Sequence, residues 1–180
     1  LYLRFSNADF ILGGISVRSI YEDWYGDIVK LTWKPNMKLN DDYVKITSVH
    51  TVCIQSNKVL LSLIKNRGFN LPGGHINLGE TLEDALNREV LEEAYVKGNL
   101  TYLGCLEVSH EENPNFNPNG KYPRIAYQAF YRLDITECLP FLRENESQAR
   151  IWVEPSEISY VINDHELSHD IIEAAININV

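Results

Sequence analysis

The sequence lacks both long apolar runs and paired cysteines. None of its hydrophobic segments approaches the roughly 18–20 apolar residues that a membrane-spanning helix needs, so we expect no membrane span and no membrane partner. The three cysteines, Cys53, Cys105 and Cys138, are odd in number, far apart and without C-x-x-C spacing. This pattern predicts neither a disulfide framework nor a zinc site. We interpret the cysteines as buried, reduced thiols of a cytoplasmic protein.

Basic residues are also few. Lysine and arginine number 16 against 25 aspartate and glutamate residues, the formal net charge is −9, and no cluster of basic residues occurs. This balance argues against a protein that binds long nucleic acid through its phosphates. A small anionic substrate would need a cation between itself and the protein. The 180 residues, 44% of them hydrophobic, are enough for one substantial core.

The first 40 residues differ in character from the rest of the chain. They are rich in aromatic residues, and alternating stretches at residues 15–18 and 28–33 indicate short strands. We therefore predict a β-rich N-terminal extension over residues 1–40, packed on a main domain over residues 41–180.

The main domain combines strand patterns with two helical patterns. Apolar residues at four-residue spacing predict an amphipathic helix over residues 81–97, which a Thr81-x-x-Asp84 pattern begins. Residues 166–178 predict a second helix with Asp164 as its cap. This order predicts an α+β fold with a mixed β-sheet and helices on its faces. The expected strands cover residues 44–54, 59–64, 100–109, 125–133 and 149–153, with a polar loop at 65–74, a long loop at 111–123 and a helical turn at 155–160.

Three carboxylates on the first helix carry the chemistry. Glu89, Glu92 and Glu93 stand at positions i, i+3 and i+4, so they project within an arc of about 100°. Like charges at this spacing destabilise a helix by a few tenths of a kcal/mol per pair, and a cation reverses that effect. Mg²⁺ prefers such oxygen ligands. A solvated acidic face is the alternative, but the glycines at 73–74 and 79 predict tight turns that bring backbone carbonyls close to this face.

The stretch from Gly74 to Val96 resembles the Nudix box, G-x5-E-x7-R-E-U-x-E-E-x-G-U, where U is an aliphatic residue. Every defined position matches except one, because Tyr95 stands where the family has glycine. Tyrosine is sterically disfavoured in the left-handed conformation that ends a helix, so Gly98 is expected to end this helix about one turn later. The resemblance extends loosely over residues 43–178 and implies the Nudix fold, a mixed β-sheet sandwiched between helices.

The resemblance also implies an activity and a metal site. It implies a pyrophosphohydrolase that uses Mg²⁺, with Mn²⁺ as a substitute, to cleave a diphosphate linkage in a nucleoside diphosphate, nucleoside triphosphate or nucleotide derivative by attack of water at phosphorus. The implied metal ligands are Glu89, Glu92, Glu93 and the carbonyl of Gly73. Gly74, Glu80 and Arg88 would support the loop–helix–loop that carries these ligands.

The general base is left open between several carboxylates. Family members take the base from the box helix, here Glu92 or Glu93, or from a later loop. In this sequence Glu144 and Glu146 lie in such a loop, and we favour Glu146. His110 with Glu111 and Glu112 forms another group, whose alternative interpretation is a solvated strand end.

The sequence indicates the residues that recognise the substrate less clearly than it indicates the metal ligands. Lys65 and Arg67 precede the glycine turn, where relatives carry basic residues that face the substrate, and solvated loop cations are the alternative. Tyr127 is a candidate to stack on a base, as is Phe130, unless both belong to the core. Trp24, Tyr25 and Trp33 are expected to pack the added strands on the domain or to form a homodimer contact, and contact with the substrate is the alternative. The 111–123 loop and the opening segment are our candidates for selecting the substrate.

Two other functions share this scaffold. Isomerisation of a prenyl diphosphate would need a catalytic cysteine in the site, and the scattered cysteines give no support for one. A non-catalytic nucleotide-sensing module usually loses the box glutamates, whereas all three are present here. We therefore expect a small phosphorylated, nucleotide-like substrate as the partner of this protein, and no long nucleic acid.

Overall fold

The computed structural model describes residues 8–12, 15–24, 26–39 and 45–178. The first residue of the strand expected at 44–54 and the side chain of Tyr25 therefore lie outside the described residues. The elements are β1 (Ala8–Leu12), β2 (Ile15–Trp24), β3 (Asp27–Pro35), β4 (Ile46–Gln55), β5 (Lys58–Ile64), β6 (Gly68–Asn70), β7 (Gly73–His75), α1 (Leu82–Glu93), β8 (Val96–Ser109), β9 (Ile125–Cys138), β10 (Ser147–Val153), a 3₁₀ helix (Pro155–Tyr160) and α2 (Leu167–Asn177).

The strands form one mixed sheet. Its order is β1-β2-β3-β8-β9-β4-β5-β10, with β6 beside β5 and β7 beside β4. The β4–β9 pair is parallel, whereas the pairs on either side of it are antiparallel. The N-terminal strands join this same sheet, because β3 pairs with β8 from Lys30↔Ser109 to Pro35↔Gly104. The extension is therefore β-rich, as predicted, and it lengthens the sheet of the main domain.

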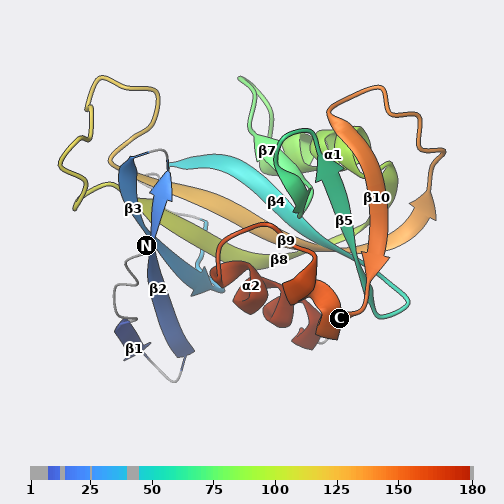
Figure 1. Cartoon of the computed structure of the whole chain (residues 1–180), viewed down its shortest axis with the longest axis horizontal. Coiled ribbons are helices and arrows are strands. Elements are labelled where there is room, and N and C mark those ends of the chain that lie inside the picture. Colours follow the sequence, from blue (N-terminus) through green and yellow to red (C-terminus); the bar gives the residue numbers. More distant parts are fainter. Residues whose placement is uncertain (1–7, 13–14, 25, 40–44, 179–180) are drawn as a thin grey trace.

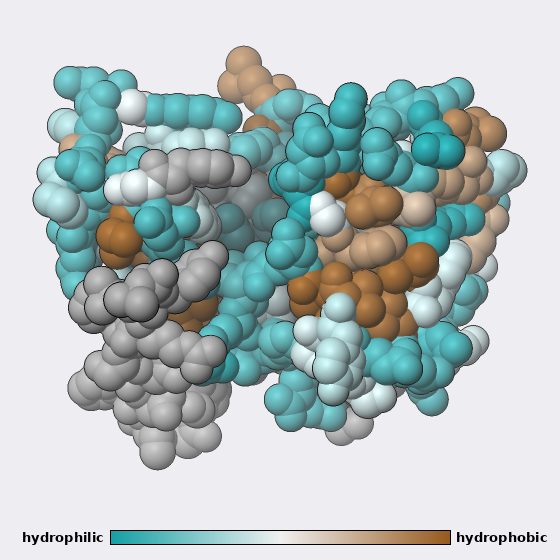
Figure 2. Space-filling model, in the orientation of Figure 1, coloured by the Kyte–Doolittle hydropathy of each residue, from teal (hydrophilic) through white to brown (hydrophobic). Residues whose placement is uncertain are grey.

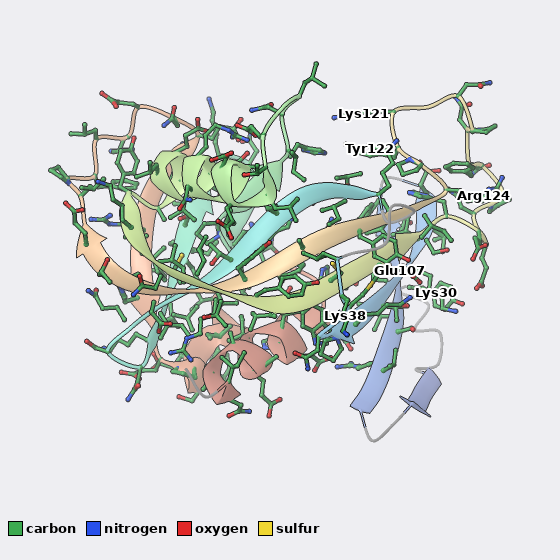
Figure 3. All side chains as sticks on the ribbon, turned by 180° about the vertical axis from the view of Figure 1, so that it is seen from behind. Lys30, Lys38, Glu107, Lys121, Tyr122 and Arg124 are labelled. Atoms are coloured by element: carbon green, nitrogen blue, oxygen red, sulfur yellow. The ribbon has the colours of Figure 1, made fainter. Side chains whose placement is uncertain are left out.

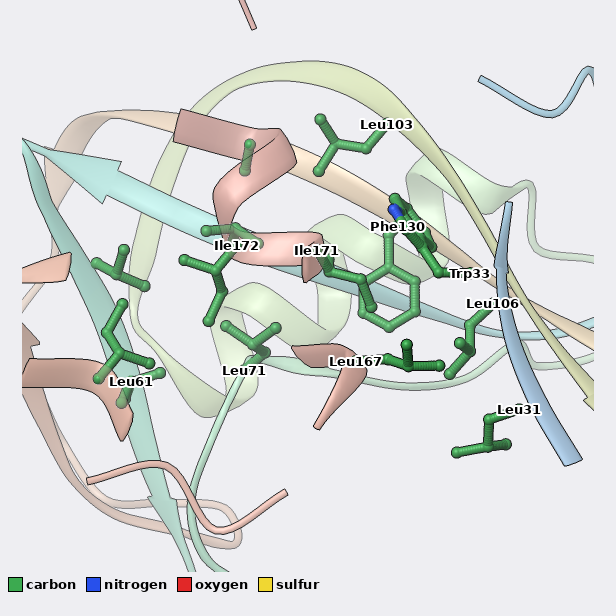
Figure 4. Close-up of a cluster of buried hydrophobic side chains, with 14 of the residues drawn as sticks. Leu31, Trp33, Leu61, Leu71, Leu103, Leu106, Phe130, Leu167, Ile171 and Ile172 are labelled. Carbon is green, nitrogen blue, oxygen red and sulfur yellow. The ribbon is translucent and has the colours of Figure 1, made fainter. Parts of the chain in front are cut away.

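Helices cover both faces of the sheet (Figure 1). Alternate residues of a strand point to opposite faces, so each strand supplies both cores. On β4, Val52 belongs to the core under α2, whereas Val49 and Cys53 belong to the core under α1. Figure 4 shows the first of these cores, in which Leu167, Ile171 and Ile172 of α2 pack on aliphatic and aromatic side chains of the sheet. The α+β prediction with a sheet between helices is confirmed.

The N-terminus of α1 follows the sequence prediction. Thr81 is the N-cap: its hydroxyl accepts from the backbone N–H of Asp84 at 3.1 Å, and the Asp84 side chain accepts from the backbone N–H of Thr81 at 3.4 Å. This reciprocal pair satisfies two N–H groups that a helix start leaves without partners.

The C-terminus of α1 does not follow the prediction. The helix ends at Glu93 instead of continuing to Gly98, and Tyr95 itself takes the left-handed conformation, with φ +54°. The ring of Tyr95 is buried, its hydroxyl accepts from the backbone N–H of Glu144 at 2.9 Å, and its carbonyl accepts from Arg150 Nη1 at 2.7 Å. These tertiary contacts offset a conformational cost of about 1–2 kcal/mol.

Other differences from the prediction are local. The strands β6 and β7 interrupt the loop expected at 65–74, and three-residue strands leave little alternation in a sequence. Asp164 was expected to cap α2, but the N-cap is Glu166 without a side-chain cap bond. Asp164 instead accepts from the Ser168 hydroxyl at 2.7 Å. Among the described residues, no helix is long and apolar enough to cross a membrane.

Candidate functional site

A cleft of about 1000 Å³ lies between α1 and β7 on one side and the β2–β3 hairpin with the 111–123 loop on the other. The space-filling view shows the hollow near its centre, with hydrophilic residues around much of its rim (Figure 2). Residues from both ends of the chain meet there. The lining includes Trp24, Asp27, Thr47, Ser48, His50, Arg67, Gly73, Gly74, His75, Asn77, Glu89, Glu92, Glu93, Val108, His110, Tyr122, Ala126, Gln128, Asn145 and Glu146.

The three helical glutamates all line this cleft, and two of them contact the glycine turn. Gly74 lies so close to Glu89 that a Cβ at Gly74 would come within 2.4 Å of Glu89 Oε1. The backbone N–H of Gly73 donates to Glu93 Oε2 at 3.0 Å. Only glycine permits such close approach of the backbone to the carboxylates. The glycine turn and the helix therefore form one unit.

Glu93 is the most buried of the three carboxylates, with its side chain 8% exposed. Burial raises the pKa of Glu93 to about 7, although the hydrogen bond from Gly73 acts in the opposite direction. Desolvation disfavours the charged form of an isolated carboxylate, and the neighbouring Glu89 adds to this effect. A cation at this position would compensate the same charge.

Arg88 links the loop before the helix to the helix itself. Its Nε and Nη2 donate to the two carboxylate oxygens of Glu80 at 2.7 and 2.9 Å, and its Nη2 also donates to the His75 carbonyl at 3.0 Å. These bonds hold the pKa of Glu80 at about 2. Arg88 Nη1 further contacts Glu89 at 2.7 Å and Glu92 at 3.5 Å.

The donor set fits Mg²⁺ in its chemistry. Carboxylate oxygens and the close glycine turn suit a hard cation that keeps part of its water shell. In the part of the chain that the structure describes, no three carboxylate, imidazole or thiol groups meet in an arrangement that holds a metal ion. Arg88 bonds Glu89 and contacts Glu92, so metal binding requires these two side chains to turn from the guanidinium.

Arg67 and Glu146 lie together at the mouth of the cleft. Arg67 Nη2 is 3.6 Å from Glu146 Oε2 and 3.9 Å from Glu93 Oε1. Both side chains are largely exposed to solvent and line the cleft, as the sequence predicts. Lys65 is exposed but is not among the lining residues, and its backbone N–H donates to the Glu146 carbonyl. Glu144 also lies outside the lining.

The structure does not bring Tyr127 into the cleft. Its neighbours Ala126 and Gln128 line the cleft, so Tyr127 points to the opposite face of the sheet, where its hydroxyl donates to Glu107 at 2.8 Å. Phe130 is a buried core residue that stacks on His50, with ring centroids 5.1 Å apart. Of the two aromatic candidates, Phe130 therefore serves the core.

Sequence reasoning missed several residues of the cleft. His50 and Gln128 belong to strands whose alternation gave no sign of a site, and Tyr122 lies in a loop without a motif. Packing is the favoured expectation for Trp24 and substrate contact the alternative; the structure places Trp24 in the cleft lining and Trp33 in the core. Of the His110 group, only His110 lines the cleft.

The cysteines lie away from the cleft lining. Cys53 and Cys105 are buried under α1, as expected, but Cys138 is exposed at the end of β9, so its predicted burial is wrong. All three are free thiols. The cysteine placement that a prenyl diphosphate isomerase would require does not occur here.

Comparison with known proteins gives a family match. The family model described as NUDIX domain matches residues 45–174. No curated protein matches the chain. Among solved structures, a mutant of the Bacillus subtilis pyrophosphohydrolase BsRppH is 22% identical, with a TM-score of 0.56 over 84% of this chain and 82% of that chain.

Two further solved structures are similar. A NUDIX hydrolase from Nitrosomonas europaea is 25% identical, with a TM-score of 0.54 over 72% of this chain and 88% of that chain. The NUDIX domain of Shewanella oneidensis NrtR, solved in complex with ADP ribose, is 18% identical, with a TM-score of 0.53 over 78% of this chain and 92% of that chain. The family match spans well over half of the sequence and contains every box residue. The chain therefore belongs to the NUDIX family and is an enzyme of the Nudix hydrolase type.

Proposed function

We propose that this protein is a Mg²⁺-dependent pyrophosphohydrolase that cleaves the diphosphate linkage of a nucleotide derivative by attack of water at phosphorus. One observation carries the proposal: Glu89, Glu92 and Glu93 line a single large cleft, and the glycine turn closes directly on two of them. A solvated acidic helix face would require neither the glycine turn nor the burial of Glu93.

Each box residue has a role in this proposal. Glu89, Glu92 and Glu93, with the carbonyl of Gly73, would hold the ion, which when bound neutralises negative charge on the diphosphate. Gly74 leaves space for Glu89. The remaining support is the Arg88–Glu80 ion pair, which positions the loop against the helix. Mn²⁺ has the same charge and accepts the same oxygen ligands, so it would substitute.

Glu146 is our assignment for the general base. Its carboxylate is exposed to the cleft, and Arg67 holds it within reach of the buried Glu93. A base must reach the attacking water as well as accept its proton, and Glu146 lies in the cleft lining without being committed to the helix. Arg67 is the cleft cation that we assign to the substrate phosphates. Lys65 is not included in this role.

A small nucleotide-like ligand fits the surroundings of the glutamates. The cleft volume of about 1000 Å³ is at the upper end of typical ligand sites. A NUDIX domain of the same fold is known with ADP ribose, a nucleotide diphosphate of suitable size. Free thiols at all three cysteines favour a reducing compartment such as the cytoplasm.

Chromatography of the products formed from a panel of nucleoside triphosphates, nucleotide sugars and dinucleotides tests the proposal, because cleavage of a diphosphate linkage releases a nucleotide together with pyrophosphate, phosphate or a second phosphomonoester. We expect turnover with Mg²⁺, none in a chelator, and a loss of at least about 100-fold in kcat for Glu93→Gln. Glu83→Gln is the matched control, because Glu83 lies on the same helix but outside the cleft lining. Glu146→Gln should lower kcat while Mg²⁺ affinity is kept.

A sensing module predicts a different result. It would bind nucleotides without turnover of any compound in the panel, and Glu93→Gln would then behave as Glu83→Gln does. That outcome would overturn the hydrolase proposal.

A further inference from the structure

The cleft has a wall that the NUDIX match does not include. Trp24 and Asp27 face each other across the end of the β2–β3 hairpin, and both line the cleft. They precede the matched residues 45–174. The N-terminal extension therefore contributes to the cleft as well as to the sheet.

The long loop braces this wall. The side-chain amide of Asn113, which is buried, donates to Asp27 Oδ1 at 3.2 Å. The Tyr21 hydroxyl donates to Glu112 at 2.8 Å, and Lys30 lies 3.6 Å from the same carboxylate. Figure 3 shows the loop carrying Lys121, Tyr122 and Arg124 next to the hairpin strand that carries Lys30. The hairpin and the loop thus hold each other in place.

Trp24 presents a free aromatic ring to this space. It is 37% exposed, and no ring or cation of the described residues stacks on it. Tyr122 also lines the cleft, but Lys121 lies 5.0 Å from the centre of its ring and its hydroxyl contacts His75 Nε2 at 3.2 Å. A single exposed aromatic residue is ordinary on a protein surface, so it is the place of Trp24 in the cleft lining that makes it a candidate to contact a ligand.

The cleft lining that includes Trp24 also contains apolar residues. Val108 and Ala126 face each other in the β8–β9 register, are buried, and line the cleft. Gln128, two residues along β9, adds an amide that both donates and accepts hydrogen bonds. An apolar floor, an indole and an amide together suit a flat ring with polar edges, and they line the same cleft as the glutamates.

We propose that the N-terminal hairpin supplies a ring-binding subsite, in which Trp24 stacks on the nucleobase of the substrate and Gln128 contacts the edge of the base. This inference rests on the proposed function for the identity of the substrate. Stacking between a base and an aromatic side chain strengthens binding by roughly 5- to 150-fold. It tolerates different bases, because every base has an aromatic face.

Calorimetric titration with Mg²⁺ and ADP, GDP, CDP or UDP tests the subsite without requiring turnover. We expect Trp24→Ala to weaken binding of at least one of these nucleotides about tenfold or more, and Trp24→Phe to retain most of the affinity. Pyrophosphate, which has no base, should bind wild type and both variants equally. Tyr160→Ala is the matched control, because Tyr160 is an 88% exposed aromatic residue outside the cleft lining.

The outcomes separate the two proposals. Weaker nucleotide binding by Trp24→Ala, without hydrolysis by any variant, would support the subsite and overturn the hydrolase. Equal nucleotide affinity in wild type and a folded Trp24→Ala, or no binding of any of the four nucleotides by wild type, would overturn the subsite. Quenching of tryptophan emission by the bound nucleotide, lost in Trp24→Phe, gives an independent signal for the same contact.

Discussion

Glu93 shows how one residue carries information at two levels. Its spacing from Glu89 marks it as a candidate ligand in the sequence, but its burial and its bond from Gly73 are visible only in the structure. Burial raises its pKa to about 7 from the ordinary value of 4.5 for a glutamate. This shift makes the stability of the metal-free protein depend on pH.

The folded state binds the Glu93 proton more tightly than the unfolded state does. The resulting stabilisation is complete below about pH 4.5 and is lost as the pH rises through about 7. We expect the free energy of unfolding in a chelator to fall between pH 5 and pH 8 by about 2–3 kcal/mol more in wild type than in Glu93→Gln. Urea denaturation of both proteins at pH 5 and at pH 8 measures these free energies of unfolding. A difference between the two proteins that does not change with pH would contradict the assigned burial.

The comparison between the two proteins removes the contribution of His50. Burial lowers the pKa of His50 to about 4, so its contribution to stability is lost as the pH falls below about 6.5. This pH dependence is opposite in sign to that of Glu93. Because both proteins contain His50, its effect cancels in the difference.

The residues of the site were predictable where a motif holds them. Glu89, Glu92 and Glu93 of the box line the cleft, and so does Arg67, for which solvated loop cations were the alternative. Trp24 belongs to the opening segment that was a candidate for selecting the substrate, but its individual place depends on pairing between β3 and β8, which are far apart in sequence. Tyr127 was a candidate because aromatic residues stack, but strand alternation and its bond to Glu107 direct it away from the cleft.

At the scale of elements, alternation and four-residue spacing predicted most strands and both helices. The errors occur where tertiary contacts, and not local sequence preference, determine where an element begins or ends. The end of α1 is the clearest case, since local preference favours glycine as the terminator and the chain uses Tyr95. Gly98 could not replace it, because this glycine lies in β8, where a Cβ would approach the Asp134 carbonyl within 2.1 Å.

Replacing Tyr95 by the glycine that the family has at this position should therefore destabilise the protein. Tyr95→Gly relieves a left-handed conformation worth about 1–2 kcal/mol. It also removes a buried aromatic side chain, whose loss costs about 3–5 kcal/mol. We expect a net decrease of about 1–4 kcal/mol in the free energy of unfolding, measured by urea denaturation.

Tyr95→Phe is the control for this change. It keeps the ring beside Phe141 and removes only the hydroxyl that accepts from the Glu144 backbone N–H, so we expect a loss of about 1 kcal/mol. A Tyr95→Gly variant more stable than wild type would show that backbone conformation outweighs the side-chain contacts.

At the scale of the whole molecule, the order of the sheet determines what the N-terminal extension is. The sequence predicts an extension over residues 1–40 that packs on the main domain, and the family match begins only at residue 45. In the structure, β3 pairs with β8 along six residue positions. Val29, Leu31 and Trp33 of β3 are buried in the core under α2. The extension is therefore continuous with the core of the domain.

A chain that begins at residue 41 should fold poorly for this reason. This chain lacks β3, so the edge of β8 would be exposed. Leu106 and Phe130 would lose the side chains of Leu31 and Trp33 that pack on them. Unpaired edges and uncovered apolar residues promote aggregation. We expect the 41–180 fragment to be largely aggregated, or to unfold well below the full chain in thermal denaturation followed by circular dichroism. A fragment that is monomeric and as stable as the full chain would instead establish residues 41–180 as an independent domain and the hairpin as a dispensable addition.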